Sequence, residues 1–153
     1  MPIALALALI FMLATFTSSC ATKTQATDKI RVAVSIPPQA EFVENVAGGR
    51  IDVTLMVPPG ANPHTYEPTP SQMTDLSRAH MYAMVGSGIE FELAWMNKLA
   101  AMNRKMLITD CSQGIQLLKL ADEQTSGFTD PHVWMSPRNA MVMTQNICNG
   151  LVK

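Results

Sequence analysis

Two of the chain's three histidines stand in short, proline-rich stretches. His64 lies in NPHTYEP and His132 lies in DPHVWMSP. Each follows a proline directly, which restricts the backbone on its approach. A single histidine is more often a surface or core residue than a ligand, but two framed in this way favour a shared role. Neutral imidazole suits zinc, manganese, iron and copper, so the pair predicts a transition-metal site.

Two imidazoles do not complete a tetrahedral shell, so the site requires further donors. Glu67 and Asp130 are the nearest carboxylates along the chain. Either could bind the ion directly or orient an imidazole by hydrogen bonding, and we favour the orienting role for both. The alternatives are local: Glu67 caps the following helix, and Asp130 stabilises the turn before Pro131.

Other chemistries have weak support in this sequence. It contains no HExxH, GxSxG or Walker A motif, so we expect no enzyme. A metallohydrolase with water on the two histidines would have only Glu67 as a general base. The third histidine, His80, opens a predicted strand and is interpreted as structural. The 12 methionines would suit Cu(I), but they follow helix and strand patterns and indicate core packing.

The cysteines do not form a metal-binding motif. No CxxC spacing is present, which excludes a cysteine-ligated zinc site at the level of sequence. Cys111 and Cys148 could form a disulfide in an oxidising compartment. Their apolar neighbours favour two buried free thiols instead.

The elements that must position the two histidines alternate between strand and helix. Strands are predicted at 30–36, 51–57, 80–86 and 105–109, and helices at 39–49, 70–78, 89–100 and from 137 onward. This order predicts an α/β fold, a parallel sheet flanked by helices. His64 and His132 would then lie at the carboxyl edge of the sheet, where such folds bind ligands.

Two helix starts are marked by capping residues. Thr69-Pro70-Ser71-Gln72 has the form of a capping box with proline in the first turn. Ser136-Pro137 is a typical pair of N-cap and first-turn residues. The apolar stripe that follows Pro137 continues to the last residue, so we expect a truncated helix there.

The N-terminus indicates export. Residues 2–16 carry no charge and suit the apolar part of a secretory signal. Thr17-Ser18-Ser19 then precedes Cys20, an arrangement similar to a lipoprotein signal (1–20), with a plain signal peptide as the alternative. Residues 21–29 are polar and predict a flexible tether. The net charge of −1 does not favour binding to nucleic acid or to an anionic membrane surface.

Three stretches resemble one family. VPPGANPHTYEPTPSQM (57–73) and DPHVWMSPRNA (130–140) look like the two characteristic segments of the zinc- and manganese-type solute-binding proteins of ABC importers. SIPPQAEFVENVAGGRIDV (35–53) resembles their opening strand and helix. The resemblance extends from about residue 30 to the end, in the same order and with the same spacing.

The resemblance implies a fold of two α/β lobes, joined by a long rigid helix, with the metal ion in the cleft between them. Residues 30–136 would form the N-terminal lobe, and residues 137–153 would begin the connecting helix. His64 and His132 match the two ligands that this lobe supplies. The remaining ligands would come from a second lobe, which we do not expect within these 153 residues.

The implied function is metal capture outside the cytoplasmic membrane, in the periplasm or at the outer face of that membrane. The chain would be a monomer, anchored by lipid at Cys20, and would present Zn²⁺ or Mn²⁺, with Fe²⁺ as a third candidate, to an ABC importer permease. Because only neutral imidazole coordinates, metal binding by the full-length parent should weaken as pH falls through about 6.5. The alternative is an adhesin-like surface lipoprotein that has lost metal transport with its second lobe.

The sequence does not decide which metal is bound. Many zinc members carry a histidine-rich loop before the second segment, but residues 111–130 contain no histidine. In the family the deciding ligand is the third one, which would lie beyond Lys153. Histidine there would favour zinc, and glutamate would favour manganese or iron.

Overall fold

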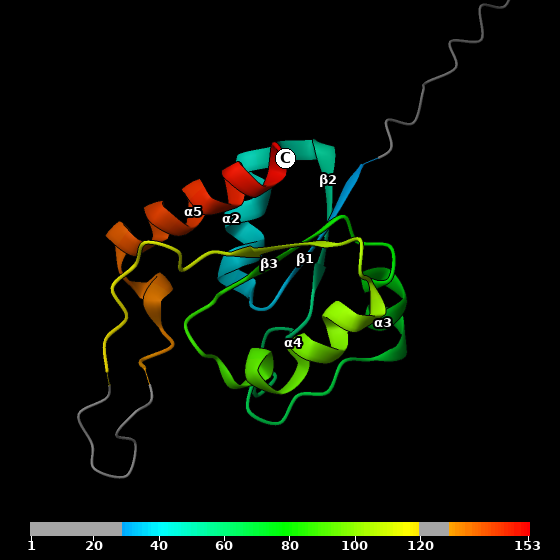
Figure 1. Cartoon of the computed structure of the whole chain (residues 1–153), viewed down its shortest axis with the longest axis horizontal. Coiled ribbons are helices and arrows are strands. Elements are labelled where there is room, and N and C mark those ends of the chain that lie inside the picture. The colour runs from blue at the N-terminus through cyan, green and yellow to red at the C-terminus, as the bar shows by residue number, and fades with distance from the viewer. Residues whose placement is uncertain (1–28, 120–128) are drawn as a thin grey trace, which may run out of the picture.

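The computed structural model describes residues 29–119 and 129–153, so the predicted signal, Cys20 and most of the tether lie outside the described residues. Within these ranges strands and helices alternate as predicted (Figure 1). The strands are β1 (Ile30–Val34), β2 (Ile51–Leu55), β3 (Met81–Met84) and β4 (Leu107–Asp110). The helices are α2 (Pro37–Ala47), α3 (Pro70–Leu76), α4 (Glu90–Met102) and α5 (Pro137–Leu151), with short 3₁₀ turns η1 (Gly48–Arg50) and η2 (Val133–Met135).

The four strands form one parallel sheet in the order β2-β1-β3-β4. This confirms the predicted α/β class. Val32 at the centre pairs with Val53 on one side and Met81 on the other. The chain passes from β2 on one side of β1 to β3 on the other, so a topological switch point lies at the carboxyl ends of β1 and β3. Ligands of open α/β sheets bind at such points.

Helices cover both faces of the sheet (Figure 1). Successive residues of a strand point to opposite faces; accordingly Val32 and Val34 pack in one core and Ala33 in the other. The first core contains Met143 and Ile147 of α5, and the second contains Phe91 and Leu99 of α4 together with α3 residues. Apolar side chains on both faces explain why the strands are nearly continuous apolar runs in the sequence.

The strands are shorter than the sequence predicts because the chain bends into loops before the apolar runs end. Ile51–Leu55 replaces the predicted 51–57. Met56 and Val57 still donate backbone hydrogen bonds to Val34 and Ser35, at 2.9 and 3.0 Å. Their side chains are buried, which accounts for the apolar signal.

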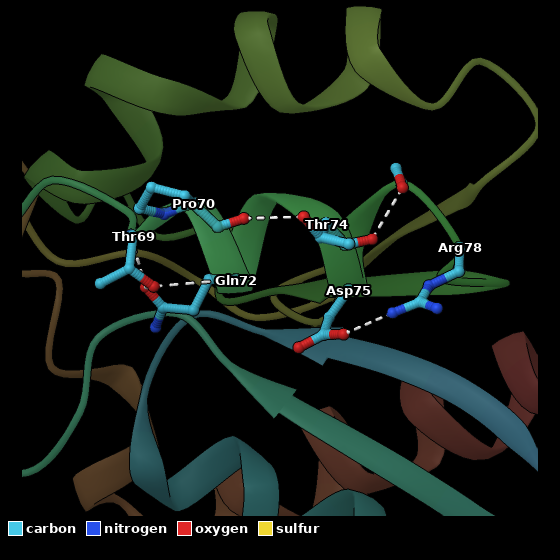
Figure 2. Close-up of polar contacts among 7 residues, drawn as sticks. Thr69, Pro70, Gln72, Thr74, Asp75 and Arg78 are labelled. Atoms are coloured by element: carbon cyan, nitrogen blue, oxygen red, sulfur yellow. Dashed lines mark hydrogen bonds and ion pairs between the residues drawn. The ribbon is translucent and has the colours of Figure 1, made fainter.

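Helix α3 begins at the predicted capping box (Figure 2). The Gln72 backbone N–H donates to the Thr69 hydroxyl at 3.3 Å, and the Thr69 backbone N–H donates to the Gln72 side chain at 2.9 Å. At α5 the prediction is only partly right. Ser136 occupies the N-cap position, but its side chain makes no capping hydrogen bond.

Three further observations bear on the sequence predictions. Cys111 and Cys148 are free thiols, as the favoured interpretation held, but only Cys111 is buried and Cys148 is half-buried. The His80 Nδ1 accepts a hydrogen bond from the Arg31 backbone N–H at 2.9 Å, so this histidine has a structural contact at the start of β3. None of the helices in residues 29–119 and 129–153 is both long and apolar enough to span a bilayer.

Candidate metal-binding site

The two predicted histidines line the same cleft. The cleft has a volume of about 580 Å³ and lies at the carboxyl edge of the sheet. All four carboxyl-edge connections contribute to it. They supply residues 36–38 after β1, 57–61 with Pro63 and His64 after β2, 89–90 before α4, and 130–132 with Trp134 before α5. The expectation that both histidines open on one sheet edge is therefore met by the topology.

His64 is held by a hydrogen-bonded turn within a loop that is closed at its base. The Asn62 side-chain oxygen accepts the His64 backbone N–H at 3.0 Å. Gln72 closes the loop, since its amide donates to the carbonyls of Leu55 and Met56, each at 2.8 Å, while its oxygen accepts from Thr69. The end of β2 and the start of α3 are thereby joined, which limits the freedom of the loop between them.

His132 is held in the same way. An Asp130 carboxylate oxygen accepts the His132 backbone N–H at 2.9 Å and lies 2.8 Å from the ring Nδ1. The two hydrogen bonds from His132, the backbone one first, hold the pKa of Asp130 below its ordinary value. The ring also packs beside Trp134, with 5.3 Å between ring centroids. Asp130 therefore both stabilises the turn and contacts the imidazole.

The carboxylate beside His64 is not the one that the sequence suggested. The His64 Nδ1 lies 3.2 Å from Oε1 of Glu90, the first residue of α4. Glu67 is exposed and is not among the residues that line the cleft. Thr69, paired with Gln72 in the capping box, caps α3 in place of Glu67. In this structure Glu90 takes the orienting position that was assigned to Glu67.

Each imidazole thus has a carboxylate on Nδ1. A ring N–H donated to a carboxylate leaves the other nitrogen, Nε2, with the lone pair that a metal ion requires. The side chains of His64 and His132 are 61% and 58% exposed. Ion pairs this exposed contribute little to stability, so these contacts serve the orientation of the rings better than they serve the fold.

The described residues offer only part of a coordination shell. Within 29–119 and 129–153, no group of three or more histidine, cysteine, aspartate or glutamate side chains is placed to hold a metal ion. Two imidazoles, each with its own carboxylate, are the donors available at the cleft. A closed tetrahedral site requires additional ligands.

A repeated triplet in the sequence indicates how the two histidines are positioned. Both histidines are the third residue of an Asx-Pro-His triplet, Asn62-Pro63-His64 and Asp130-Pro131-His132. Asn and Asp side chains commonly accept the backbone N–H two residues later, and both do so here. The triplet therefore indicated Asn62 as a positioning residue. No comparable local pattern links Glu90 to His64.

Comparison with known proteins identifies the family of this chain. Residues 32–153 match the family model described as zinc-uptake complex component A, periplasmic. The chain belongs to this family. The resemblance seen in the sequence is confirmed, since the relatives below are substrate-binding proteins of metal ABC transporters.

Two curated relatives are streptococcal. The chain is 30% identical to the manganese ABC transporter substrate-binding lipoprotein PsaA of Streptococcus pneumoniae, over 98% of this chain and 49% of that protein. It is 32% identical to the iron ABC transporter substrate-binding lipoprotein MtsA of Streptococcus pyogenes serotype M1, over 88% and 45%.

A crystal structure of a zinc-bound deletion mutant of ZnuA superposes with a TM-score of 0.75 at 38% identity, covering 82% of this chain and 46% of that one. The chain therefore spans about half the length of the relatives it matches.

Proposed function

We propose that this chain is the metal-binding N-terminal lobe of an ABC importer's substrate-binding protein, with His64 and His132 as ligands of the captured ion. The observation that carries the proposal is that two exposed histidines from separate loops line one cleft, each with a carboxylate on Nδ1. Glu90 and Asp130 would hold the ring protons and so present Nε2 to the ion. The ion is cargo, and the proposed role is capture and not catalysis.

The metal is a separate question. The relatives are named for manganese and iron, and the zinc-bound structure for zinc. All three ions accept imidazole and carboxylate ligands. We therefore propose a divalent transition metal as the cargo class, and the binding experiment ranks Zn²⁺, Mn²⁺ and Fe²⁺.

Calorimetric titration of the protein purified after export tests the proposal. We expect saturable binding by the parent and none by the His64→Ala/His132→Ala variant. His80→Ala is the matched control, because His80 contacts Arg31 and does not line the cleft. Equal binding by the parent and the double variant would refute the assignment of both ligands.

A second pair of variants tests the carboxylates. We expect Glu90→Gln to weaken metal binding about 10–100-fold, the range typical of residues that orient a ligand. Glu67→Gln changes a nearby carboxylate that does not line the cleft and should leave affinity within about twofold of the parent. Weaker metal binding by Glu67→Gln, together with parent-like binding by Glu90→Gln, would assign the orienting role to Glu67 instead.

Attachment to the membrane is proposed from the sequence and the relatives. Cys20 follows the apolar run of residues 2–16, and both streptococcal relatives are named lipoproteins. We propose lipidation at Cys20 and delivery of the ion to an ABC permease by a monomer. Incorporation of labelled fatty acid that is lost in Cys20→Ala would support the anchor; label retained in that variant would exclude this cysteine.

A further inference from the structure

A short turn between β3 and α4 contacts the segment that carries His132. The Ser87 hydroxyl donates to the Pro131 carbonyl at 2.6 Å, and the Thr129 hydroxyl donates to the Ser87 carbonyl at 2.7 Å. These hydrogen bonds join segments that are 44 and 42 positions apart. Ser87 is 1% exposed, so its hydroxyl has little access to water as an alternative partner.

The contact is close as well as polar. Gly88 has φ +95°, and a Cβ built on it would lie 3.3 Å from the Thr129 hydroxyl oxygen. A side chain there would meet both an unfavourable backbone conformation and a neighbour tighter than ordinary van der Waals contact. Residues 87–88 are therefore closely packed against residues 129–131.

The turn itself is anchored to the fold. The buried Glu92 carboxylate accepts the backbone N–H groups of Val85 and Gly86, at 2.6 and 3.0 Å. It also accepts the hydroxyl of Ser35, which follows β1. The Glu92 side chain from α4 therefore holds the backbone of this turn, and Ser35 bonds to the same carboxylate. Backbone held by a buried, fully hydrogen-bonded carboxylate is a rigid support for the segment that it contacts.

The same segment also contacts the other histidine. Three residues after Ser87, Glu90 lies 3.2 Å from the His64 Nδ1. A stretch of four residues, 87–90, therefore contacts the His132 segment at one end and His64 at the other. Because this segment is short and rigid, it limits how far the His64 loop and the His132 loop can move relative to each other.

We propose that Ser87 is a positioning residue for metal binding: with Thr129 it holds the Asp130-Pro131-His132 turn against the segment whose Glu90 orients His64. This proposal rests on the proposed function. It adds that the β3–α4 turn sets the positions of His64 and His132 relative to each other. Ser87 touches neither imidazole in this arrangement; it acts through the Pro131 carbonyl.

The test compares Ser87→Ala with Ser112→Ala. Both remove a buried serine hydroxyl that donates to a backbone carbonyl at this edge, but only Ser87 bonds to the His132 segment. Thr129→Val removes the reciprocal hydrogen bond while keeping the side-chain shape. The probes are Zn²⁺ by calorimetry and Co²⁺ by visible absorption, whose d–d bands report the ligand geometry. Urea unfolding without metal measures stability.

We expect Ser87→Ala and Thr129→Val each to weaken Zn²⁺ and Co²⁺ binding about 10-fold and to alter the Co²⁺ spectrum, by analogy with other residues that support ligands. Ser112→Ala should bind like the parent, with a loss of stability similar to that of Ser87→Ala. The proposal would be overturned if Ser87→Ala bound both ions as tightly as the parent. It would also be overturned if the loss of affinity in each variant were simply proportional to its loss of stability.

A parent protein that binds neither ion would refute the proposed function, and a metal-free measurement then decides the present inference. It is the amide hydrogen exchange rate of His132, whose N–H is bonded to Asp130. Faster exchange in Ser87→Ala than in Ser112→Ala would support a positioning role for Ser87. Equal rates in the two variants would overturn it.

Discussion

Glu92→Gln tests how the buried carboxylate supports the carboxyl edge. In the parent, Oε1 accepts from the Val85 N–H and the Ser35 hydroxyl, and Oε2 accepts from the Gly86 N–H. The side chain is 4% exposed. Glutamine has the same shape but one acceptor oxygen, so its NH₂ group must face a backbone N–H, donor against donor.

The magnitude follows from that mismatch. Leaving one buried donor without an acceptor costs about 1–3 kcal/mol. We expect Glu92→Gln to lower the free energy of unfolding by this amount at pH 5. In a domain of about 100 residues, each kcal/mol corresponds to a melting temperature lower by about 4–8 °C. Urea unfolding followed by tryptophan fluorescence provides the measurement.

The same variant should change the pH dependence of stability. Burial raises the pKa of Glu92 above its ordinary value of 4.5, against the lowering effect of its hydrogen bonds from Ser35, Gly86 and Val85. A carboxyl whose folded pKa is raised contributes stability that is complete below its unfolded pKa and is lost as pH rises through the folded pKa. Glutamine does not titrate, so the stability gap between parent and variant should narrow as pH rises from 4.5.

Exposed Glu67→Gln is the control for removing a carboxylate without burial. Other titrating groups are common to parent and variant, so the difference isolates position 92. A variant as stable as the parent at pH 5 would refute the hydrogen-bond argument. A gap that widens as pH rises would show instead that the ionised carboxylate is the form the fold prefers.

Two further predictions concern residues near the ends of the strands. Gly86→Ala should destabilise the fold by about 2–3 kcal/mol, because a Cβ there would lie 1.8 Å from Oδ1 of Asp110 at a φ of +79°. Gly114→Ala is the control, with φ +86° and nothing within 4 Å, and it should cost only about 1 kcal/mol of backbone strain. Equal losses of unfolding free energy in urea would contradict the steric argument. His80→Ala should lower the free energy of unfolding by about 1 kcal/mol, because the Arg31 N–H loses the imidazole as its acceptor. Its Zn²⁺ affinity by calorimetry should equal that of the parent, and a loss of affinity would indicate that His80 belongs to the metal site.

Local patterns in the sequence carried much of the fold. Continuous apolar runs, breaks at Pro and Gly, and the box from Thr69 to Gln72 predicted the strands, the helices and their order, and the structure confirms them. Such features depend on neighbours within a few residues, so they can be read without knowing the fold. The ends of the strands were less accurate, since Met56 and Val57 are buried just beyond the regular ladder.

The parallel sheet also follows from the order of elements, and it explains why His64 and His132 were expected at one edge. The carboxyl ends of parallel strands meet there, whatever the distance along the chain. The sequence determined the residue types at the cleft and the Asx-Pro-His turns that carry the histidines. Asp130 could be named as a neighbour of His132 from the sequence because their contact is local.

Only the tertiary structure decided which carboxylate joins His64. Glu67 is near in sequence, but the loop places it outside the cleft, whereas Glu90 reaches the imidazole from the start of α4. The turn at Ser87 is likewise invisible in the sequence, because its partners follow β4 along the chain. Contacts of this kind depend on how the strands are ordered in the sheet and on how closely the loops pack, and no local pattern records either.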